Sequence, residues 1–464
     1  MLSRSSIFRI SLFAVLAFLY LAGLSRVGIF GPDEPRYAAI GVAMAHSGDW
    51  ITPRLWGHPW FEKSPLLYWQ TAIATLLGFG PETAPRLPVA LTALGLVVFL
   101  FVYLKRRLSC AISLHSSILL AGAVGWLAFG SVGVTDVLLT AHLTVSVLLA
   151  VFGGPAWLVG VFLGLAALAK GLVPFALFIP VLWWLYRSKR LRDLIPISIA
   201  CLIVAGPWYA AVTLRHGHAF FDEFIMKHHF GRFADPSLQH VRPFWFYIPM
   251  FAGALLPWTG LIPFGLGGRL KDPRLRFLTA WVWFGFVFFS IFKNKLPGYI
   301  LPLMPIACIL IAAALEESQS AVAPILAITA ALLIGFGLQI LPALPQMLTE
   351  GFTKTALPAV QWWDWAIGIA AGIGIWWIAR RGRTTIALCC VSAIVLAGLA
   401  WVKFSPLAID VDRAASARGV SRTASKDGCV HPADRDLRYG LSYYWGFEVP
   451  ECNDETLSKR IRKP

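Results

Sequence analysis

The chain has 464 residues, of which 58% are hydrophobic and only 14% charged, whereas soluble domains are nearer half apolar and a quarter charged. This composition excludes a water-soluble protein. The formal net charge of +16 comes from short basic clusters between apolar runs, with no basic face interleaved with aromatics, which argues against nucleic acid as a partner.

Apolar segments long enough to cross a membrane recur along the chain. A transmembrane helix needs about 20 apolar residues at about 1.5 Å of rise each. We predict an all-α polytopic membrane protein, with about thirteen spans in a transmembrane domain at 1–403 and a short polar tail at 404–464. The predicted spans are 10–29, 86–104, 111–129, 137–153, 156–169, 172–186, 194–213, 244–266, 277–292, 299–315, 322–342, 362–379 and 384–402.

The first apolar segment follows Arg4 and Arg9 and has the pattern of a signal peptide. No small-x-small cleavage site follows before Gly31, so we predict a retained first span. Later basic clusters lie at 105–107, 187–192, 269–276 and 380–383. The positive-inside rule makes these clusters and the N-terminus cytoplasmic. The first loop (30–85), a second large loop (215–243) and the tail are then outside.

The first outer loop opens with adjacent carboxylates, Asp33 and Glu34, followed by Arg36 and Tyr37. Adjacent carboxylates repel, and burial would raise the pKa of one of them, as acid–base chemistry requires. The same pair is compatible with a plain helix start, where acids lie at the positive end of the dipole. Amphipathic stretches such as 37–46 are expected to lie flat at the membrane surface.

Two isolated charges interrupt the most apolar part of the chain. Asp136 is the only carboxylate in residues 83–192, and Lys170 is the only Lys or Arg in residues 108–186. A charge at mid-bilayer costs about 2.5–3.5 kcal/mol on insertion scales, so each needs a reason. The predicted spans put both at outer ends. They are either interfacial residues of short loops or members of one shared outer site.

The other outer segments add cations and histidines. Residues 215–243 contain His228, His229, Arg232, His240 and Arg242. Histidines together with Glu62 suit a metal, although no close-spaced ligand pair is present. Arginine suits phosphate better, because its fork of N–H donors matches phosphate oxygens. Lys293 and Lys295 lie outside against the positive-inside trend, which indicates an anionic ligand.

The predicted topology therefore collects carboxylates and four cations on the outer side of the membrane. The cations are Lys63, Lys170, Arg232 and Lys295. This mixture suits a phosphate leaving group held by cations while a carboxylate acts at the other end of the substrate.

The cysteines divide into two groups. Five lie in or beside apolar runs and are interpreted as small core residues: Cys110, Cys201, Cys308, Cys389 and Cys390. Cys429 and Cys452 lie in the polar tail, outside the membrane, where a disulfide persists. We predict a Cys429–Cys452 disulfide that closes a small outer subdomain.

The outer motifs resemble a known family when they are taken in chain order over residues 30–305. They are Asp33-Glu34-x-Arg36-Tyr37-Ala38, Gly48-Asp49-Trp50, Phe61-x-Lys63-x-Pro65-Leu66-x-Tyr68-Trp69, Thr135-Asp136, Ala169-Lys170-Gly171, His229-x-x-Arg232-Phe233, His240-x-x-Pro243-Phe244-Trp245 and Lys295-Leu296-Pro297-x-Tyr299. The resemblance is to polyprenyl-phosphate-sugar-dependent glycosyltransferases, most closely the lipid A aminoarabinose transferases and more distantly the protein O-mannosyltransferases.

This resemblance implies a GT-C fold and inverting sugar transfer from an undecaprenyl-type phosphate carrier, at the periplasmic face of the bacterial inner membrane. It implies Asp33 and Asp136 as the catalytic carboxylates, with Glu34, Arg36 and Tyr37 in support. The residues implied to bind the carrier phosphate are Lys63, Lys170, Arg232, Lys295 and Tyr299. No cofactor is required, although relatives can bind zinc through the residues that match Glu62 and His229. We expect a monomer.

Two departures from the family pattern bear on the acceptor more than on the chemistry. Ser64 replaces the usual first proline of Lys-Pro-Pro, and the C-terminal outer domain is shorter than in the aminoarabinose transferases. Lipid A, another glycolipid, a glycan and a protein all remain open as acceptors. A transporter or flippase of the same lipid-linked sugar is the main alternative, and a scaffold of an envelope assembly is a third. A transporter does not need the paired Asp33 and Asp136, and a scaffold does not explain the isolated Lys170.

Overall fold

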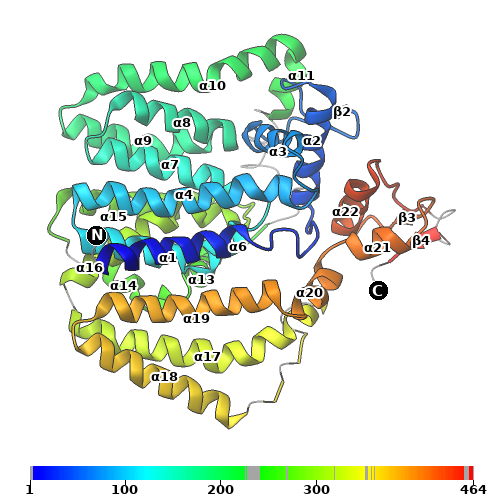
Figure 1. The fold of residues 1–464 in the computed structure, drawn as a ribbon. Coiled ribbons are helices and arrows are strands. Elements are labelled where there is room, and N and C mark those ends of the chain that lie inside the picture. The colour runs from blue at the N-terminus through cyan, green and yellow to red at the C-terminus, as the bar shows by residue number, and fades with distance from the viewer. Residues whose placement is uncertain are drawn as a thin grey trace.

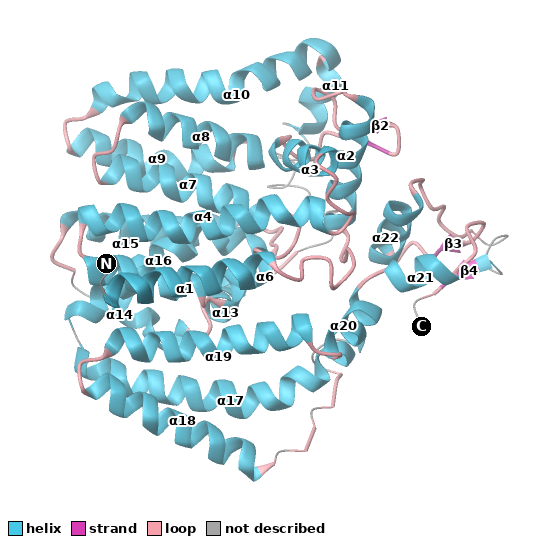
Figure 2. Ribbon diagram, in the orientation of Figure 1, coloured by secondary structure: helices cyan, strands magenta, loops and turns pink. Residues whose placement is uncertain are grey.

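The computed structural model describes residues 4–462 except 225, 227–240, 268–269, 318, 351–353, 357, 360 and 454–458. Long helices lie side by side in one bundle, and smaller elements cover one end of it (Figures 1 and 2). The bundle helices are α1 (Arg4–Leu21), α4 (Thr83–Arg107), α5 (Cys110–Ala121), α6 (Val124–Phe129), α7 (Asp136–Val151), α8 (Ala156–Lys170), α9 (Val173–Arg187), α10 (Leu194–His216), α13 (Tyr247–Ala254), α14 (Ile262–Gly267), α15 (Pro273–Ile291), α16 (Met304–Glu317), α17 (Gln319–Glu350), α18 (Trp362–Arg380) and α19 (Thr384–Phe404). Short connecting helices are η1 (Leu191–Asp193), α11 (His218–Phe220), η3 (Phe244–Phe246), η4 (Trp258–Leu261) and η5 (Pro297–Leu303).

The long apolar helices make this a polytopic membrane protein. Among the described residues, six helices are long and apolar enough to cross a membrane, or seven if one bent pair counts as a span. Four further apolar helices, α5, α7, α8 and α9, are shorter. Each of the predicted apolar segments is helical over most of its length, while the count of thirteen crossings stays a prediction.

Three of these segments differ in detail from simple spans. The first helix ends at Leu21, before Gly23, whose φ of 72° lies in the left-handed region that ends helices. The segment 111–129 divides into α5 and α6 at Gly122. The segment 244–266 bends by 111° between α13 and η4, next to Pro257.

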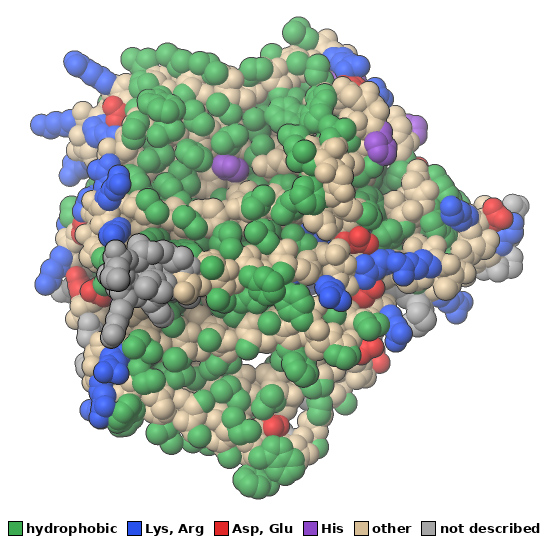
Figure 3. Space-filling model, viewed as in Figure 1, with side chains coloured by type: hydrophobic (Ala, Val, Ile, Leu, Met, Phe, Trp, Pro, Cys, Tyr) green, Lys and Arg blue, Asp and Glu red, His purple; other side chains and the backbone are tan. Residues whose placement is uncertain are grey.

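The core of the bundle lies around η5 and α16. The span that they form is 94% buried, whereas the other long spans are 22–39% buried. Its residues are apolar on every side, as expected for a helix enclosed by other helices. The remaining spans expose apolar side chains on their outer flanks, which Figure 3 shows as hydrophobic surface.

The two ends of the bundle differ in charge. Lys and Arg side chains project from the end where α4 and α9 finish, on the left in Figure 3. The opposite end holds the starts of α7 and α9 and the finishes of α8 and α10 (Figure 1). We call this opposite end, with the elements that cover it, the capped end.

The first half of the cap is the predicted first outer loop. It contains α2 (Asp33–Ser47), the antiparallel pair β1 (Arg54–Leu55) and β2 (His58–Pro59), and α3 (Leu66–Leu76). Trp56 and Gly57 form the two-residue turn of this hairpin, both with positive φ. Trp208 on α10 donates its indole N–H to the Ile51 carbonyl at 3.0 Å, which ties the loop to the bundle.

The second half of the cap is a C-terminal subdomain, residues 405–462. It contains α20 (Leu407–Ala415), α21 (Arg418–Thr423), α22 (Arg435–Trp445) and the short parallel pair β3 (Cys429–Val430) and β4 (Arg460–Ile461). Its small apolar core is separate from that of the bundle and includes Val420, Leu441 and Val449. Cys429 and Cys452 form a disulfide, so the predicted pairing is confirmed.

Candidate functional site

The carboxylates of Asp33 and Glu34 lie in opposite environments at the start of α2. Both belong to the first helical turn, so the predicted helix start is confirmed. The Asp33 side chain is 40% exposed, whereas that of Glu34 is fully buried. Consecutive helical residues project about 100° apart, so one carboxylate faces outward while its neighbour enters the protein.

Glu34 is part of a buried clamp with Arg86, a residue near the start of α4. The two groups form a bidentate pair, with Nε–Oε1 and Nη2–Oε2 distances of 2.6 and 2.7 Å. The backbone N–H groups of Gly133 and Phe30 also donate to Glu34, at 2.7 and 3.1 Å. Arg86 donates further to the carbonyls of Leu24, Val27 and Gly28. Glu34 is predicted above to support the catalytic carboxylates. In this geometry its contacts, with Arg86 and with backbone N–H groups, are structural.

Asp33 belongs to a second set of charges, which we call the Arg36 cluster: Asp33, Arg36, Glu62 and Lys63. Arg36 donates to Asp33 and, at 2.9 Å, to Glu62, whose other oxygen accepts from Lys63 at 2.7 Å. Negative and positive groups therefore alternate along the cluster. Burial alone would lower the pKa of the Arg36 guanidinium, but Glu62, Tyr37 and Asp33 raise it above its ordinary value, so Arg36 stays charged.

Aromatic side chains enclose the Arg36 cluster. Burial, and then the charges of Asp33 and Glu62, raise the pKa of Tyr37 well above its ordinary value, so this phenol stays neutral. Trp60 lies with its ring centroid 5.6 Å from the Arg36 guanidinium carbon. The indole nitrogen of Trp60 and the hydroxyl of Tyr68 are buried without a hydrogen-bond partner among the described residues.

Asp136 and Lys170 form a second pair at the capped end. Asp136 is the first residue of α7 and Lys170 the last of α8, and their side chains meet with an Nζ–Oδ1 distance of 2.6 Å. The Lys170 ammonium lies 4.5 Å from the centroid of the Tyr299 ring. The chain passes close to Asp136 at residue 298, which is glycine. A Cβ at this position would lie 2.8 Å from Asp136 Oδ1. The structure thus brings together three residues predicted from separate segments.

Glu34 connects the two charged groups. It is adjacent to Asp33 in sequence, and it holds the N–H of Gly133, three residues before Asp136. The Glu34–Arg86 clamp therefore fixes the start of α2 against the loop that leads into α7. The Arg36 cluster and the Asp136–Lys170 pair consequently lie at the same end of the bundle.

Lys295 occupies a different environment from the other predicted cations. Its residue is 2% exposed, and its ammonium donates to the backbone carbonyls of Phe292 and, at 3.2 Å, Arg242. Burial lowers the pKa of this ammonium. Contact with the carrier phosphate stays a prediction, and it requires the ammonium to leave these carbonyls.

Arg232 and His229 lie outside the described residues, so the structure does not place these predicted side chains. Within the part of the chain that is described, no group of three His, Cys, Asp or Glu side chains has the arrangement of a metal site. Both oxygens of Glu62 accept hydrogen bonds from cations, so a zinc ion there would compete with Arg36 and Lys63 for the carboxylate. Zinc at Glu62 and His229 stays a prediction.

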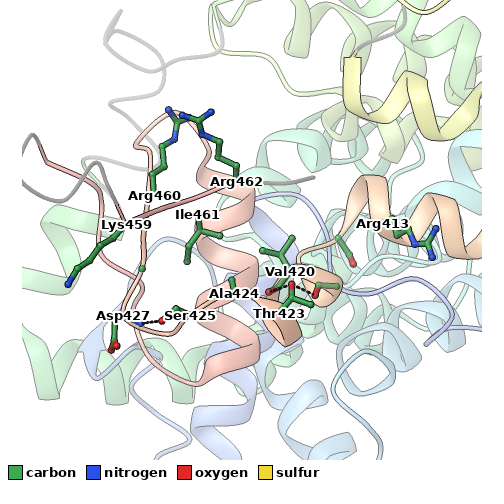
Figure 4. Close-up of a pocket in the computed structure, with 13 residues that line it drawn as sticks. Arg413, Val420, Thr423, Ala424, Ser425, Asp427, Lys459, Arg460, Ile461 and Arg462 are labelled. Carbon is green, nitrogen blue, oxygen red and sulfur yellow. Dashed lines mark hydrogen bonds between the residues drawn. The ribbon is translucent and has the colours of Figure 1, made fainter.

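A separate cavity of about 900 Å³ lies in the C-terminal subdomain (Figure 4). Its lining includes Arg413, Asp427, Lys459, Arg460 and Arg462, and none of the residues of the Arg36 cluster or the Asp136–Lys170 pair. Figure 4 shows Arg413 and Lys459 directed to opposite sides of this cavity. This cavity is therefore separate from the Arg36 cluster and from the Asp136–Lys170 pair.

Arg86, Tyr68 and Trp60 are neighbours of the site that the sequence predictions did not include. Arg86 carries a signal that was available, because it is a basic residue at the outer end of a predicted span, against the positive-inside trend. Tyr68 and Trp60 are part of an aromatic-rich loop, and nothing in their spacing separates them from ordinary core aromatics.

Comparison with known proteins places the chain among glycosyltransferases, although no protein-family model matches it. It is 32% identical over 383 residues to the undecaprenyl phosphate-α-4-amino-4-deoxy-L-arabinose arabinosyl transferase of Serratia proteamaculans, covering 77% of this chain and 68% of that protein. It is 33% identical to the Pseudomonas aeruginosa protein of the same name, covering 63% of this chain and 56% of that protein. The chain thus spans between about half and about two thirds of the length of these relatives.

Solved structures of other proteins share the fold of this chain. ArnT from Cupriavidus metallidurans bound to undecaprenyl phosphate superposes with a TM-score of 0.74 at 25% identity, covering 96% of this chain and 86% of ArnT. The archaeal oligosaccharyltransferase AglB from Archaeoglobus fulgidus has a TM-score of 0.54 at 11% identity, covering 97% of this chain and 65% of AglB, and shares the fold alone.

Proposed function

This chain belongs to the family of undecaprenyl phosphate-aminoarabinose transferases, with their GT-C fold, and from this membership we propose that it transfers a sugar from a polyprenyl phosphate carrier to an acceptor at the capped end. The acceptor is a lipid A, another glycolipid, a glycan or a protein. The observation that carries the proposal is the exposed Asp33 carboxylate beside buried cations, at the same end as the Asp136–Lys170 pair.

In the proposed reaction, an acceptor oxygen attacks the anomeric carbon of the sugar while the bond from that carbon to the phosphate oxygen breaks. The polyprenyl phosphate leaves with both electrons of that bond, and the configuration at the anomeric carbon inverts. For a hydroxyl acceptor, Asp33 takes the proton, which is typically worth about 10²–10⁴ in rate. For a phosphate acceptor, which is already anionic, Asp33 positions the acceptor instead.

The cations offset the charge that develops on the leaving phosphate. Lys170 and Lys63 are already charged and oriented by Asp136 and Glu62, so little reorganisation is needed when the donor binds. Arg232 is proposed to act with them. Asp136 holds Lys170 and is proposed also to bind a sugar hydroxyl, and Tyr299 lies against the same ammonium. No step of this scheme passes through a metal.

We further propose a topology of thirteen spans in the bacterial inner membrane. The basic end of the bundle is then cytoplasmic, together with the N-terminus, as the positive-inside rule requires. The capped end and the C-terminal subdomain are periplasmic, where the Cys429–Cys452 disulfide persists. The protein acts as a monomer in this proposal.

The test is transfer of labelled sugar from a polyprenyl-phosphate-sugar pool by the purified protein and by the Asp33→Asn variant. We expect the wild type alone to release free polyprenyl phosphate and to yield a labelled acceptor that mass spectrometry identifies. Asp33→Asn should fold normally, because its side chain is 40% exposed and near-isosteric. Near-normal turnover by that variant would contradict the assignment of Asp33.

A transporter of the same lipid-linked sugar predicts a different result in the same preparation. The wild type would bind the donor and move it across reconstituted vesicles without releasing free polyprenyl phosphate. That outcome would replace the transferase proposal.

A further inference from the structure

The C-terminal subdomain contacts the Arg36 cluster directly through one aromatic ring. The ring of Tyr439, on α22, has its centroid 5.1 Å from the Arg36 guanidinium carbon. Tyr37 and Trp60 approach the same carbon at 6.0 and 5.6 Å. Two of the three rings come from the first outer loop, whereas Tyr439 lies about 400 positions later in the chain. The setting of Arg36 is therefore completed by the C-terminal subdomain.

The ring of Tyr439 is itself held in place. It stacks on the indole of Trp56, with centroids 5.7 Å apart and an interplanar angle of 21°. Trp56 has a φ of 50°, a conformation that costs energy for a bulky residue and persists only where the surroundings impose it. Only 9% of Tyr439 is exposed. A buried, stacked ring is a rigid wall for the guanidinium beside it.

Further contacts hold the subdomain against residues 25–29 and against the end of the first outer loop. Tyr444 accepts a hydrogen bond from the Ile29 N–H at 2.9 Å and donates to Glu82 at 3.1 Å. Tyr443 donates to the Pro81 carbonyl at 2.7 Å. Arg418 donates to the carbonyls of residues 25 and 26 at 2.9 and 2.8 Å. None of these contacts involves Arg36. A substitution among them therefore tests docking of the subdomain separately from the contact between Tyr439 and Arg36.

The orientation of Arg36 determines the orientation of two carboxylates at once. Its guanidinium is planar and donates in fixed directions, to Asp33, to Glu62 and, from Nε, to the Pro32 carbonyl at 2.9 Å. A rotation of that plane would move the Asp33 carboxylate away from its position in the cluster. A displacement of about 1 Å in a catalytic group costs as much as about 10²-fold in rate.

We propose that Tyr439 is a positioning residue for the transfer reaction: its ring fixes the plane of the Arg36 guanidinium, and Arg36 in turn orients Asp33. The C-terminal subdomain is then part of the active site and not an appended domain. This inference rests on the proposed function, in which Asp33 is the acting carboxylate.

The test compares Tyr439→Phe, Tyr439→Leu and a matched control, Tyr443→Leu, in the labelled-sugar assay. Phe keeps the aromatic face, so we expect turnover within about twofold of wild type. Leu removes that face, and kcat should fall about tenfold to hundredfold with an unchanged KM for the donor. Tyr443→Leu removes one docking contact, while those of Tyr444 and Arg418 keep the subdomain and Tyr439 in place, so kcat should stay near wild type. Equal loss in Tyr439→Leu and Tyr443→Leu would show a merely structural effect and overturn the proposal.

A double-mutant cycle with Arg36→Lys tests whether Tyr439 acts through Arg36. Lysine keeps the charge but lacks the planar fork, so Tyr439→Leu should cost less than about twofold in the Arg36→Lys background. Costs that multiply independently would contradict the proposal. If Tyr439→Leu does not accumulate as folded protein, Tyr439→Met fills similar space without an aromatic face and takes its place in the cycle.

The same assay separates failure of this inference from failure of the proposed function. An inactive Asp33→Asn with a fully active Tyr439→Leu removes only the positioning inference. An active Asp33→Asn removes the proposed function on which the inference rests.

Discussion

The Glu34–Arg86 clamp and the Arg36 cluster start from neighbouring residues and use the same kinds of charge in different ways. In the clamp, both side chains are almost fully buried, and Glu34 accepts from Arg86 and from the Gly133 N–H. In the cluster, Asp33 keeps 40% of its side chain exposed. A carboxylate that is fully enclosed by partners holds the structure together, whereas a carboxylate with an open side can meet a substrate. Exposure separates the two carboxylates, although their sequence neighbourhood is shared.

Breaking the clamp should produce the largest loss of stability. Glu34→Gln leaves the buried Arg86 charge uncompensated, which should destabilise the fold by about 3–5 kcal/mol. We expect a lower thermal unfolding temperature or a loss of folded protein in detergent. Asp33→Asn, one residue earlier, should leave the unfolding temperature within a few degrees of wild type. Equal stability of the two variants would contradict the distinction between clamp and cluster.

The Asp136–Lys170 pair tests the comparison at an intermediate burial, with side chains 15% and 10% exposed. If the pair serves the leaving phosphate, Lys170→Met should lower turnover by about 10²–10³-fold, because a preorganised charge is lost. Its unfolding temperature should change much less than that of Glu34→Gln. Lys170→Arg is the matched control, since it keeps the charge. A stability loss without a rate loss in Lys170→Met would assign the pair to the structure and not to the site.

The disulfide is expected to stabilise only the C-terminal subdomain. Replacing both Cys429 and Cys452 by Ser should cost about 2–4 kcal/mol of subdomain stability, since the bond closes a loop with a sequence separation of 23. Limited proteolysis should then cut residues 417–461 faster while the bundle resists. Replacing Cys308, which is buried in α16 of the bundle, is the control for the loss of a cysteine outside the subdomain. Unchanged proteolysis of the double Ser variant would contradict the prediction.

The smallest effect is expected from removing metal ions. Both oxygens of Glu62 already pair with Arg36 and Lys63, so the charge that a metal would supply is present in the protein. Incubation with a chelator, followed by the labelled-sugar assay, should change turnover by less than about twofold. A large loss that added zinc restores would establish the Glu62–His229 site instead.

Several features of this protein were determined by the sequence alone. Apolar length and composition act locally, so each predicted span is helical over most of its length and α2 begins at Asp33. The placement of Asp136 and Lys170 at helix ends follows from the cost of charges in the bilayer. The pairing of Cys429 with Cys452 follows from their being the two cysteines of the polar tail.

The partners of the charged residues were decided by the tertiary structure. Asp33 and Glu34 look equivalent in sequence, and only the packing of α4 against α2 brings Arg86 to one of them. Packing also turns Lys295 toward backbone carbonyls and lays Tyr439 over Arg36 from the far end of the chain. Helix formation depends on near neighbours in sequence, whereas side-chain pairing depends on which surfaces meet. For that physical reason the sequence indicates which helix ends carry charges, whereas the partner of each charge is seen only in the tertiary structure.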